Sequence, residues 1–236
     1  MFLTPQQFTS LTEDSLRDFL TLSIPEGLYL DYKAAISGTS DKEAKREFLK
    51  DVTAFANAAG GQLFLGVKEP VENQSVDVQL VGVENGASLA QDLERLASSS
   101  IDPRIPGLRI VAVSLRSGKS CAAVHIPPSL SRPHMVNHSG HRSFYVRHSE
   151  SSFQMTTHEI REAVLTSASA EARARTFVEH RLAEARSAIG ERQAAFFLQA
   201  MPLIPPEPPW DVLSSAFEGV IRGMRAAVSI RITSIW

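Results

Sequence analysis

Residues 41–67 constrain the fold more than any other part of this 236-residue chain. Apolar side chains recur at helical spacing from Phe48 to Ala59, so residues 41–59 are predicted to form a helix with one buried face. The glycines at 60 and 61 end this helix, because glycine tolerates the left-handed backbone of a helix cap. The apolar run at 62–67 then predicts a buried strand. A helix leading directly into a buried strand is typical of a domain that mixes both elements around one core.

Strand and helix patterns continue to alternate along residues 25–166. Strands are predicted at 28–34, 78–83, 108–115, 120–126 and 141–147, and helices at 4–20, 88–99, 157–166 and 168–194. The strands at 108–115 and 120–126 form a hairpin about residues 116–119. The pattern predicts an α/β (α+β) fold, a mixed sheet flanked by helices. We expect a helical lead-in at 1–20, a domain at 21–166 and a helical, proline-rich extension at 167–236.

Composition excludes several classes of protein and of site. Cys121 is the single cysteine, which rules out an internal disulfide framework and a cysteine-rich zinc site and favours a buried core thiol. No stretch approaches the roughly 18 apolar residues of a membrane span, and the first residues lack a signal-peptide pattern. We therefore expect a cytoplasmic protein with no membrane partner. The net charge of −2 excludes a histone-like coating protein but allows local basic surfaces.

Acidic and basic side chains lie on one predicted strand near the start of the domain. Side chains alternate between the two faces of a strand, so Asp31 and Lys33 share one face and Leu30 and Tyr32 the other. Glu26 lies just before this strand. Hard divalent cations prefer oxygen ligands, and a lysine can stabilise the negative charge of a reacting phosphate. The same Asp-x-Lys pattern is also typical of a solvated ion pair, which contributes little to stability.

The segment from 125 to 149 is cationic. It contains no Asp or Glu, and it carries Arg132, Arg142, Arg147 and five of the seven histidines. His134, His138 and His141 have spacings that would suit metal ligands on a helix, but the neighbouring Pro133, Ser139 and Gly140 favour a loop over a zinc site. A nucleotide-binding P-loop is excluded as well. Gly118-Lys119-Ser120 is similar to the end of one, but its upstream glycine would fall on Val113.

Four motifs occur in an order that resembles a known family. They are residues 26–33, the run 48–67 with its Ala-Phe-Ala-Asn-x-x-Gly-Gly…Gly-Val core, Arg132-Pro-His, and Phe144-Tyr-Val-Arg-His-Ser. Together they resemble the Schlafen AlbA_2 domain, a family labelled as DNA-binding or ATP-binding in bacteria, over about residues 20–166. The resemblance implies nucleic-acid binding and, as in nuclease members, a three-carboxylate site on Glu26, Asp31 and Glu69. Asp31 replaces the more usual glutamate and Glu69 the more usual aspartate, so the two side chains change reach in opposite directions.

The resemblance and the residues together predict a nuclease that depends on Mg²⁺ or Mn²⁺ and cleaves RNA (tRNA-like) or single-stranded nucleic acid rather than duplex DNA. The metal ligands would be Glu26, Asp31 and Glu69, with Lys33 as the phosphate-facing cation. The remaining nucleic-acid contacts would be Arg132, Arg142 and Arg147 on backbone phosphates and Tyr145 stacked on a base. The alternative is a non-catalytic DNA- or RNA-binding module or regulator, favoured by the near-neutral charge. Because family members tend to pair such domains, a homodimer through the helix at 168–194 is also expected.

Overall fold

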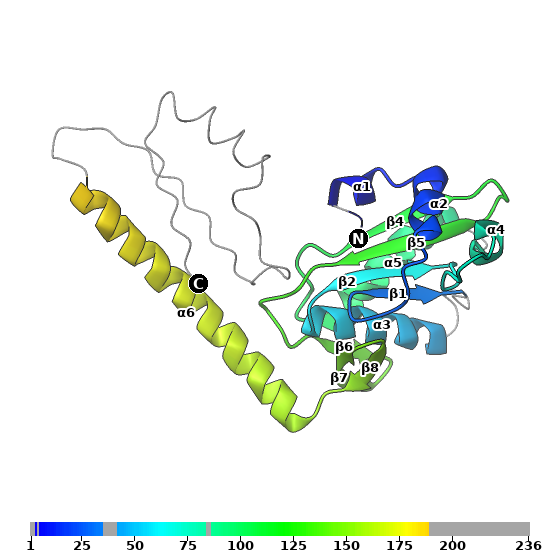
Figure 1. Cartoon of the computed structure of the whole chain (residues 1–236). Helices are drawn as coiled ribbons and strands as arrows, with labels where there is room; N and C mark the ends of the chain where they lie inside the picture. Colours follow the sequence, from blue (N-terminus) through cyan, green and yellow to red (C-terminus); the bar gives the residue numbers. More distant parts are fainter. Residues whose placement is uncertain (1–2, 4, 35–41, 84–85, 189–236) are drawn as a thin grey trace. The chain divides into compact units, whose positions relative to one another are not determined.

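The computed structural model describes residues 3, 5–34, 42–83 and 86–188, shown as ribbons in Figure 1. It divides into two compact units, Met1–Leu165 and Thr166–Trp236, and the first carries both sheets. The predicted α+β fold is confirmed by two four-stranded sheets with flanking helices. The last part of the helix predicted at 168–194 and the proline-rich part of the predicted extension lie outside the described residues.

The first sheet is mixed, with strand order β1-β2-β5-β4. Its strands are β1 (Leu30–Lys33), β2 (Gly61–Leu65), β4 (Arg109–Ser114) and β5 (Ser120–Ile126). β1 runs parallel to β2, which sets Asp31 opposite Leu63 and Lys33 opposite Leu65. β5 is antiparallel to both β2 and β4, so the predicted hairpin is confirmed.

Helices cover both faces of this sheet (Figure 1). They are α1 (Pro5–Thr9) and α2 (Glu13–Thr21) on one face, and α3 (Lys42–Asn57) and α5 (Gly86–Ser100) on the other. Leu30, Tyr32 and Phe64 point into the core beneath α1 and α2. Leu63 and Leu65 point into the core beneath α3 and α5. The alternation predicted for β1 is therefore confirmed, and Asp31 and Lys33 lie on the α3 side.

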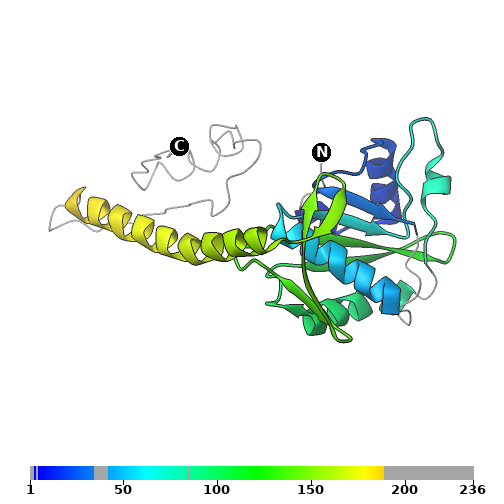
Figure 2. The same cartoon turned by 90° about the horizontal axis from the view of Figure 1, so that it is seen from below.

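A second, antiparallel sheet packs against the far side of α3. Its strands are β3 (Ile101–Asp102), β6 (Met135–His138), β7 (His141–His148) and β8 (Ser151–Gln154), in the order β3-β6-β7-β8. One hydrophobic core joins Val136 and Tyr145 of this sheet to Leu63 of the first through Phe55 of α3. Figure 2 shows α3, in light blue, from a second direction. The face predicted to be buried, with Phe48, Val52 and Phe55, is confirmed, and the second sheet buries the opposite face of the last two turns as well.

Asn57, the last residue of α3, ties the helix to the second sheet. Its Nδ2 donates to the backbone oxygens of His134 (2.9 Å) and Tyr145 (2.8 Å), and its Oδ1 accepts from the backbone N–H of His134 (2.6 Å). The side chain is buried, so these three bonds satisfy groups that water does not reach. The helix end and the β6–β7 hairpin are therefore held in one register.

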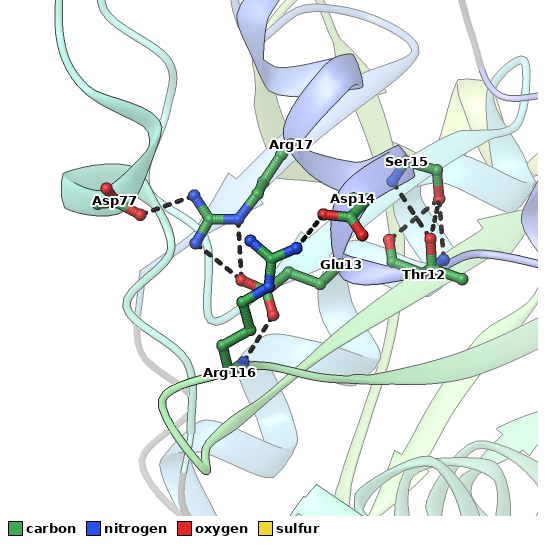
Figure 3. A network of polar contacts seen from close by, with 7 residues as sticks. All are labelled: Thr12, Glu13, Asp14, Ser15, Arg17, Asp77 and Arg116. Atoms are coloured by element: carbon green, nitrogen blue, oxygen red, sulfur yellow. Dashed lines mark hydrogen bonds and ion pairs between the residues drawn. The ribbon is translucent and has the colours of Figure 1, made fainter.

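A polar network fixes α2 over the first sheet (Figure 3). Thr12 caps α2 through a capping box with Ser15. Glu13 accepts from the guanidinium of Arg17 (2.8 Å) and from the backbone N–H of Arg116 in the β4–β5 turn (2.6 Å). Arg17 also contacts Asp77 at 2.6 Å, which ties α2 to the one-turn helix α4 (Val76–Gln79). The strand predicted at 78–83 is wrong: α4 occupies its start, and only isolated bridges at Leu80 and Val83 follow.

The last described helix, α6, runs over Thr157–Ala188 without the break predicted at residue 167. A capping box opens it, since the Glu159 carboxylate accepts from the backbone N–H of Thr156 (2.7 Å) and the Thr156 hydroxyl accepts from the backbone N–H of Glu159 (3.3 Å). The first turns pack Ile160 and Ala163 against Val146 and Met155. Within the described part of the chain, no helix is both long and apolar enough to cross a membrane.

Cys121 on β5 is the buried core thiol that the sequence predicts. Its Sγ donates to the backbone oxygen of Gly66 at 3.4 Å, and burial raises the pKa of the thiol to about 11. A neutral, hydrogen-bonded thiol of this kind behaves as a small apolar side chain rather than a nucleophile.

Candidate acidic site

Asp31 is the most deeply buried of the predicted acidic residues, with 0% of its surface exposed. Two cations flank its carboxylate: Lys33 Nζ lies 2.8 Å from Oδ2, and Arg147 Nη2 lies 3.6 Å from Oδ1. Lys33 Nζ is close enough to Oδ2 to donate a hydrogen bond, whereas Oδ1 accepts none from the described residues. A buried carboxylate is normally both paired and hydrogen-bonded, so Asp31 retains acceptor capacity that these residues do not fill.

Arg147 is an internal residue. Its Nε donates to the backbone oxygen of Gly27 (2.8 Å), its Nη2 donates to that of Leu30 (3.3 Å), and its guanidinium lies 4.5 Å from the ring centroid of Phe55. The side chain is only 1% exposed. The structure therefore places Arg147 as the partner of Asp31, away from the surface where the predicted phosphate contact would require it.

Glu26 interacts with both of the other predicted acids, Asp31 and Glu69, which come from two segments of the chain. The Glu26 carboxylate accepts from the backbone N–H of Tyr32 (3.2 Å), and the Glu69 carboxylate accepts from the backbone N–H of Glu26 (3.0 Å). Burial raises the pKa of Glu26, and the negative charges of Asp31 and Glu69 act in the same direction against the Tyr32 hydrogen bond and Lys33. The three acids that the family resemblance implied thus interact electrostatically.

Asp51 of α3 is a fourth carboxylate at this site, and no sequence pattern predicted it. It is buried, and its Oδ1 accepts from the Ser152 hydroxyl of β8 at 3.1 Å. Burial raises its pKa to about 6; the charge of Lys33 opposes that rise and the charge of Asp31 adds to it. An aspartate within the apolar stretch from Phe48 to Phe55 is the signal that could have identified it, once both faces of the helix are taken as buried.

These charges do not balance within the site. Four carboxylates stand with two cations, which leaves two negative charges in excess when every group is ionised. Carboxylate oxygens are the ligands that Mg²⁺ and Mn²⁺ prefer, and the unfilled acceptors of Asp31 suit such an ion. In the described ranges, however, no three His, Cys, Asp or Glu side chains are arranged to hold one metal ion. The donor set fits a divalent cation in chemistry and charge, and the half-buried Glu26 and exposed Glu69 would have to turn toward Asp31 to complete it.

Lys33 is the cation of the site that a ligand can reach. Its side chain is 42% exposed, while that of Arg147 is almost fully enclosed. Burial alone would lower the pKa of Lys33, but contact with Asp31 and the charges of Asp51 and Glu26 outweigh it and raise the pKa. Lys33 is therefore fully charged at neutral pH.

The other predicted nucleic-acid contacts have separate positions. Arg132 is half-buried and donates to the backbone oxygens of Asn57 (3.3 Å) and Ala58 (3.2 Å) at the end of α3. Arg142 on β7 is exposed, with its Nε 3.4 Å from Asn137 Oδ1. Tyr145 is 9% exposed and belongs to the core, with its hydroxyl 2.8 Å from His141 Nε2. Arg142 is thus the most accessible of the four.

Of the three histidines predicted to lie in a loop, His138 and His141 stand on the strands of the β6–β7 hairpin, and His134 precedes β6. His134 is buried, with Nδ1 2.6 Å from the backbone oxygen of Pro103, and burial lowers its pKa. His138 Nδ1 lies 3.0 Å from the Ser100 hydroxyl. The turn uses Ser139 and Gly140, both with positive φ, which explains why the sequence resembles a loop there. Each of the three histidines has its own partner, which for His141 is the Tyr145 hydroxyl.

The family model described as Schlafen, AlbA_2 matches residues 26–156. The match spans more than half of the chain and includes all four carboxylates of the acidic site, both of its cations and the second sheet. No curated protein matches the chain.

Proposed function

The chain belongs to the Schlafen AlbA_2 family, and from that membership we propose that it is a metal-dependent nuclease acting on RNA, tRNA-like in structure, or on single-stranded nucleic acid. Membership of the family indicates a nucleic-acid-related function. The cleavage chemistry and the choice of substrate are the parts that we propose.

The observation that carries the proposal is the Asp31 carboxylate, which is buried, flanked by Glu26 and paired with two cations, while its Oδ1 accepts no hydrogen bond within the described residues. Keeping an ionised group in this state costs stability, because desolvation is only partly offset by the ion pairs. Such costs are concentrated at functional sites, where the unfilled acceptors serve a ligand. A divalent cation would also neutralise the two excess negative charges.

Each residue of the site has a distinct role in this proposal. Asp31, Glu26 and Glu69 would hold Mg²⁺ or Mn²⁺, which when bound supplies Lewis-acid stabilisation of phosphate oxygens and a more acidic water. Lys33 directs its charge at the phosphate, where it stabilises the negative charge that develops during cleavage. Arg147 is a positioning residue. It donates to the backbone oxygens of Gly27 and Leu30 and pairs with the Asp31 carboxylate, which fixes the orientation of that carboxylate.

A cleavage assay tests the proposal. Purified protein is incubated with tRNA and with single-stranded DNA, in Mn²⁺ and in chelator. We expect cleavage of at least one substrate that requires metal and is lost in Asp31→Asn. Asp18→Asn, which changes an exposed carboxylate of α2, is the matched control and should cleave as the unaltered protein does. Absence of metal-dependent cleavage, or equal cleavage by Asp31→Asn, would contradict the nuclease.

The second candidate is a non-catalytic nucleic-acid-binding module or regulator. It is favoured by the described arrangement, in which Lys33 and Arg147 already compensate Asp31 and no three ligands converge. It predicts salt-dependent binding of the same oligonucleotides with no cleavage. Failure to bind any nucleic acid at low salt would contradict both candidates.

Self-association through α6 is a separate proposal. Val178 and Leu182 lie one helical turn apart, and each is 45% exposed. Pairing with a second copy would bury this stripe, and light scattering that shows a monomer at micromolar concentration would reject it.

A further inference from the structure

A cavity of about 600 Å³ opens between α3, α5 and the segment that follows β3. Three cations from these three elements line it: Lys45, Arg95 and Arg104. Leu96, Ser98 and Ser99 of α5 complete the wall beside them. The volume lies within the range of about 300–1,000 Å³ that is typical of sites for small molecules and cofactors.

The residues that line the cavity carry a net positive charge even when their one carboxylate is included. Asp92 is the one carboxylate of the lining, and its Oδ1 lies 3.5 Å from Arg95. Lys45 and Arg104 form no ion pair with any residue that the structure describes. The C-terminal end of α5 adds a partial negative charge of about half an elementary charge. The cavity therefore keeps an excess of between one and two positive charges.

This cavity is separate from the acidic site. Lys45 and Asp51 are six residues apart on α3, so they are displaced by about 9 Å along the helix and by about 120° around it. No residue that lines the cavity belongs to the acidic site. The two sites have opposite charge and share only the helix that separates them.

We propose that this cavity binds the phosphate group of a nucleotide, either within a nucleic-acid strand or in a free nucleotide. Guanidinium groups contact phosphate through two parallel N–H donors, and the Lys45 ammonium adds a point charge. Ser98 is exposed on the wall and offers a hydroxyl donor. For a strand the inference rests on the proposed nucleic-acid function, and it adds a contact away from the acidic site; for a free nucleotide it stands alone.

Fluorescence anisotropy with a labelled single-stranded RNA tests the inference on the full chain, in chelator so that no cleavage occurs. The variant Lys45→Ala/Arg104→Ala removes two cations of the cavity. The control Lys42→Ala/Arg46→Ala removes two exposed cations of α3 that do not line it, with the same change in net charge. We expect about tenfold weaker RNA binding for the cavity variant and a log–log salt slope shallower by about 1.4, since each phosphate contact on a single strand contributes about 0.7. The control should bind nearly as the unaltered protein does.

Competition with adenosine monophosphate and with inorganic phosphate distinguishes a free nucleotide from a nucleic-acid strand as the source of the bound phosphate. A nucleotide that binds to the unaltered chain and not to the cavity variant supports a free ligand, even if RNA does not bind at all. Unchanged RNA and nucleotide binding in the cavity variant overturns the inference, and so does an equal loss in cavity variant and control, which would reflect net charge alone. Neither result affects the nuclease, which is tested by cleavage in Asp31→Asn. Absence of both RNA and nucleotide binding overturns the inference and removes the nucleic-acid function with it.

Discussion

Arg147 and Asp31 form a buried ion pair that joins the two sheets: Nη2 of the arginine on β7 lies 3.6 Å from Oδ1 of the aspartate on β1, and both side chains are 1% exposed. Water does not solvate either charge, so each charged group is stabilised by the other. The pair therefore couples the placement of the acidic site to the docking of the second sheet.

Replacement of Arg147 by methionine should destabilise the protein by about 3–5 kcal/mol, because it leaves Asp31 as a buried charge with one fewer partner. The free energy of unfolding from urea denaturation measures this. Adding Asp31→Asn to Arg147→Met should restore part of the loss, since the uncompensated charge is then gone. Arg142→Met, at an exposed position of the same strand, should change stability by no more than about 0.5 kcal/mol. Equal effects of the two arginine variants would show that the buried pair is unimportant.

Asp51 should make stability fall as the pH rises from about 4 to about 6. Its pKa in the folded chain is raised from the ordinary 3.8 to about 6, so the folded state binds this proton more tightly than the unfolded state does. Protonated Asp51 therefore contributes its full stabilisation below about pH 4, the pKa in the unfolded chain, and this contribution is lost as the pH rises through about 6, the pKa in the folded chain. At about 1.4 kcal/mol for each unit, ionised Asp51 costs on the order of 3 kcal/mol at neutral pH.

The variant Asp51→Asn isolates this effect. Its stability relative to the unaltered protein should increase between pH 4 and pH 7 by on the order of 3 kcal/mol. Urea denaturation at several pH values, all in chelator so that no metal binds, measures the difference. Stability curves that stay parallel across this pH range would mean that Asp51 titrates normally.

Asn57→Ala should cost about 3 kcal/mol or more, because it leaves two buried carbonyls and one buried N–H of the second sheet without their partner. Thermal unfolding followed by circular dichroism gives the shift in Tm. Asn137→Ala is the matched control, since Asn137 is exposed and accepts one long bond of 3.4 Å from Arg142. A shift no larger than that of the control would refute the proposed role of Asn57.

Lys33→Met should lower the cleavage rate about 10²- to 10³-fold, the usual effect of removing one group that stabilises transition-state charge. Stability should fall as well, because Lys33 is the nearer of the two cationic partners of the buried Asp31, so the rate is compared at a temperature at which the variant is folded. Single-turnover cleavage of tRNA in Mn²⁺ measures the rate, with Lys42→Met as the control. An unchanged rate would leave Lys33 as a structural partner of Asp31 only.

Local patterns predicted much of the first sheet. The β4–β5 hairpin, the alternation on β1 and the termination of α3 before Gly60, whose φ is +73°, follow from periodicity and turn chemistry, which act between near neighbours. Gly61 has a further reason that no pattern reveals. A Cβ there would lie 2.6 Å from the Phe55 ring and from the backbone oxygen of Tyr29.

The second sheet and the burial of Arg147 could not be predicted in this way. β6 and β8 have four residues each and carry polar side chains, so they resemble loops until β7 pairs with them. Arg147 belongs to a segment that is cationic in sequence, yet its partner Asp31 lies on a strand near the other end of the domain. Burial of a charge depends on such distant partners, which is also why Asp51 was not foreseen.

The buried thiol of Cys121 can report how often the first sheet opens. Because it is the single cysteine and lies within the first sheet, reaction with a thiol reagent requires that β5 separate from its neighbours. The labelling rate under native conditions then measures how often this sheet opens, with no mutation or attached probe. Applied to the Arg147 and Asn57 variants, it would show whether loosening the second sheet is transmitted through α3 to the first.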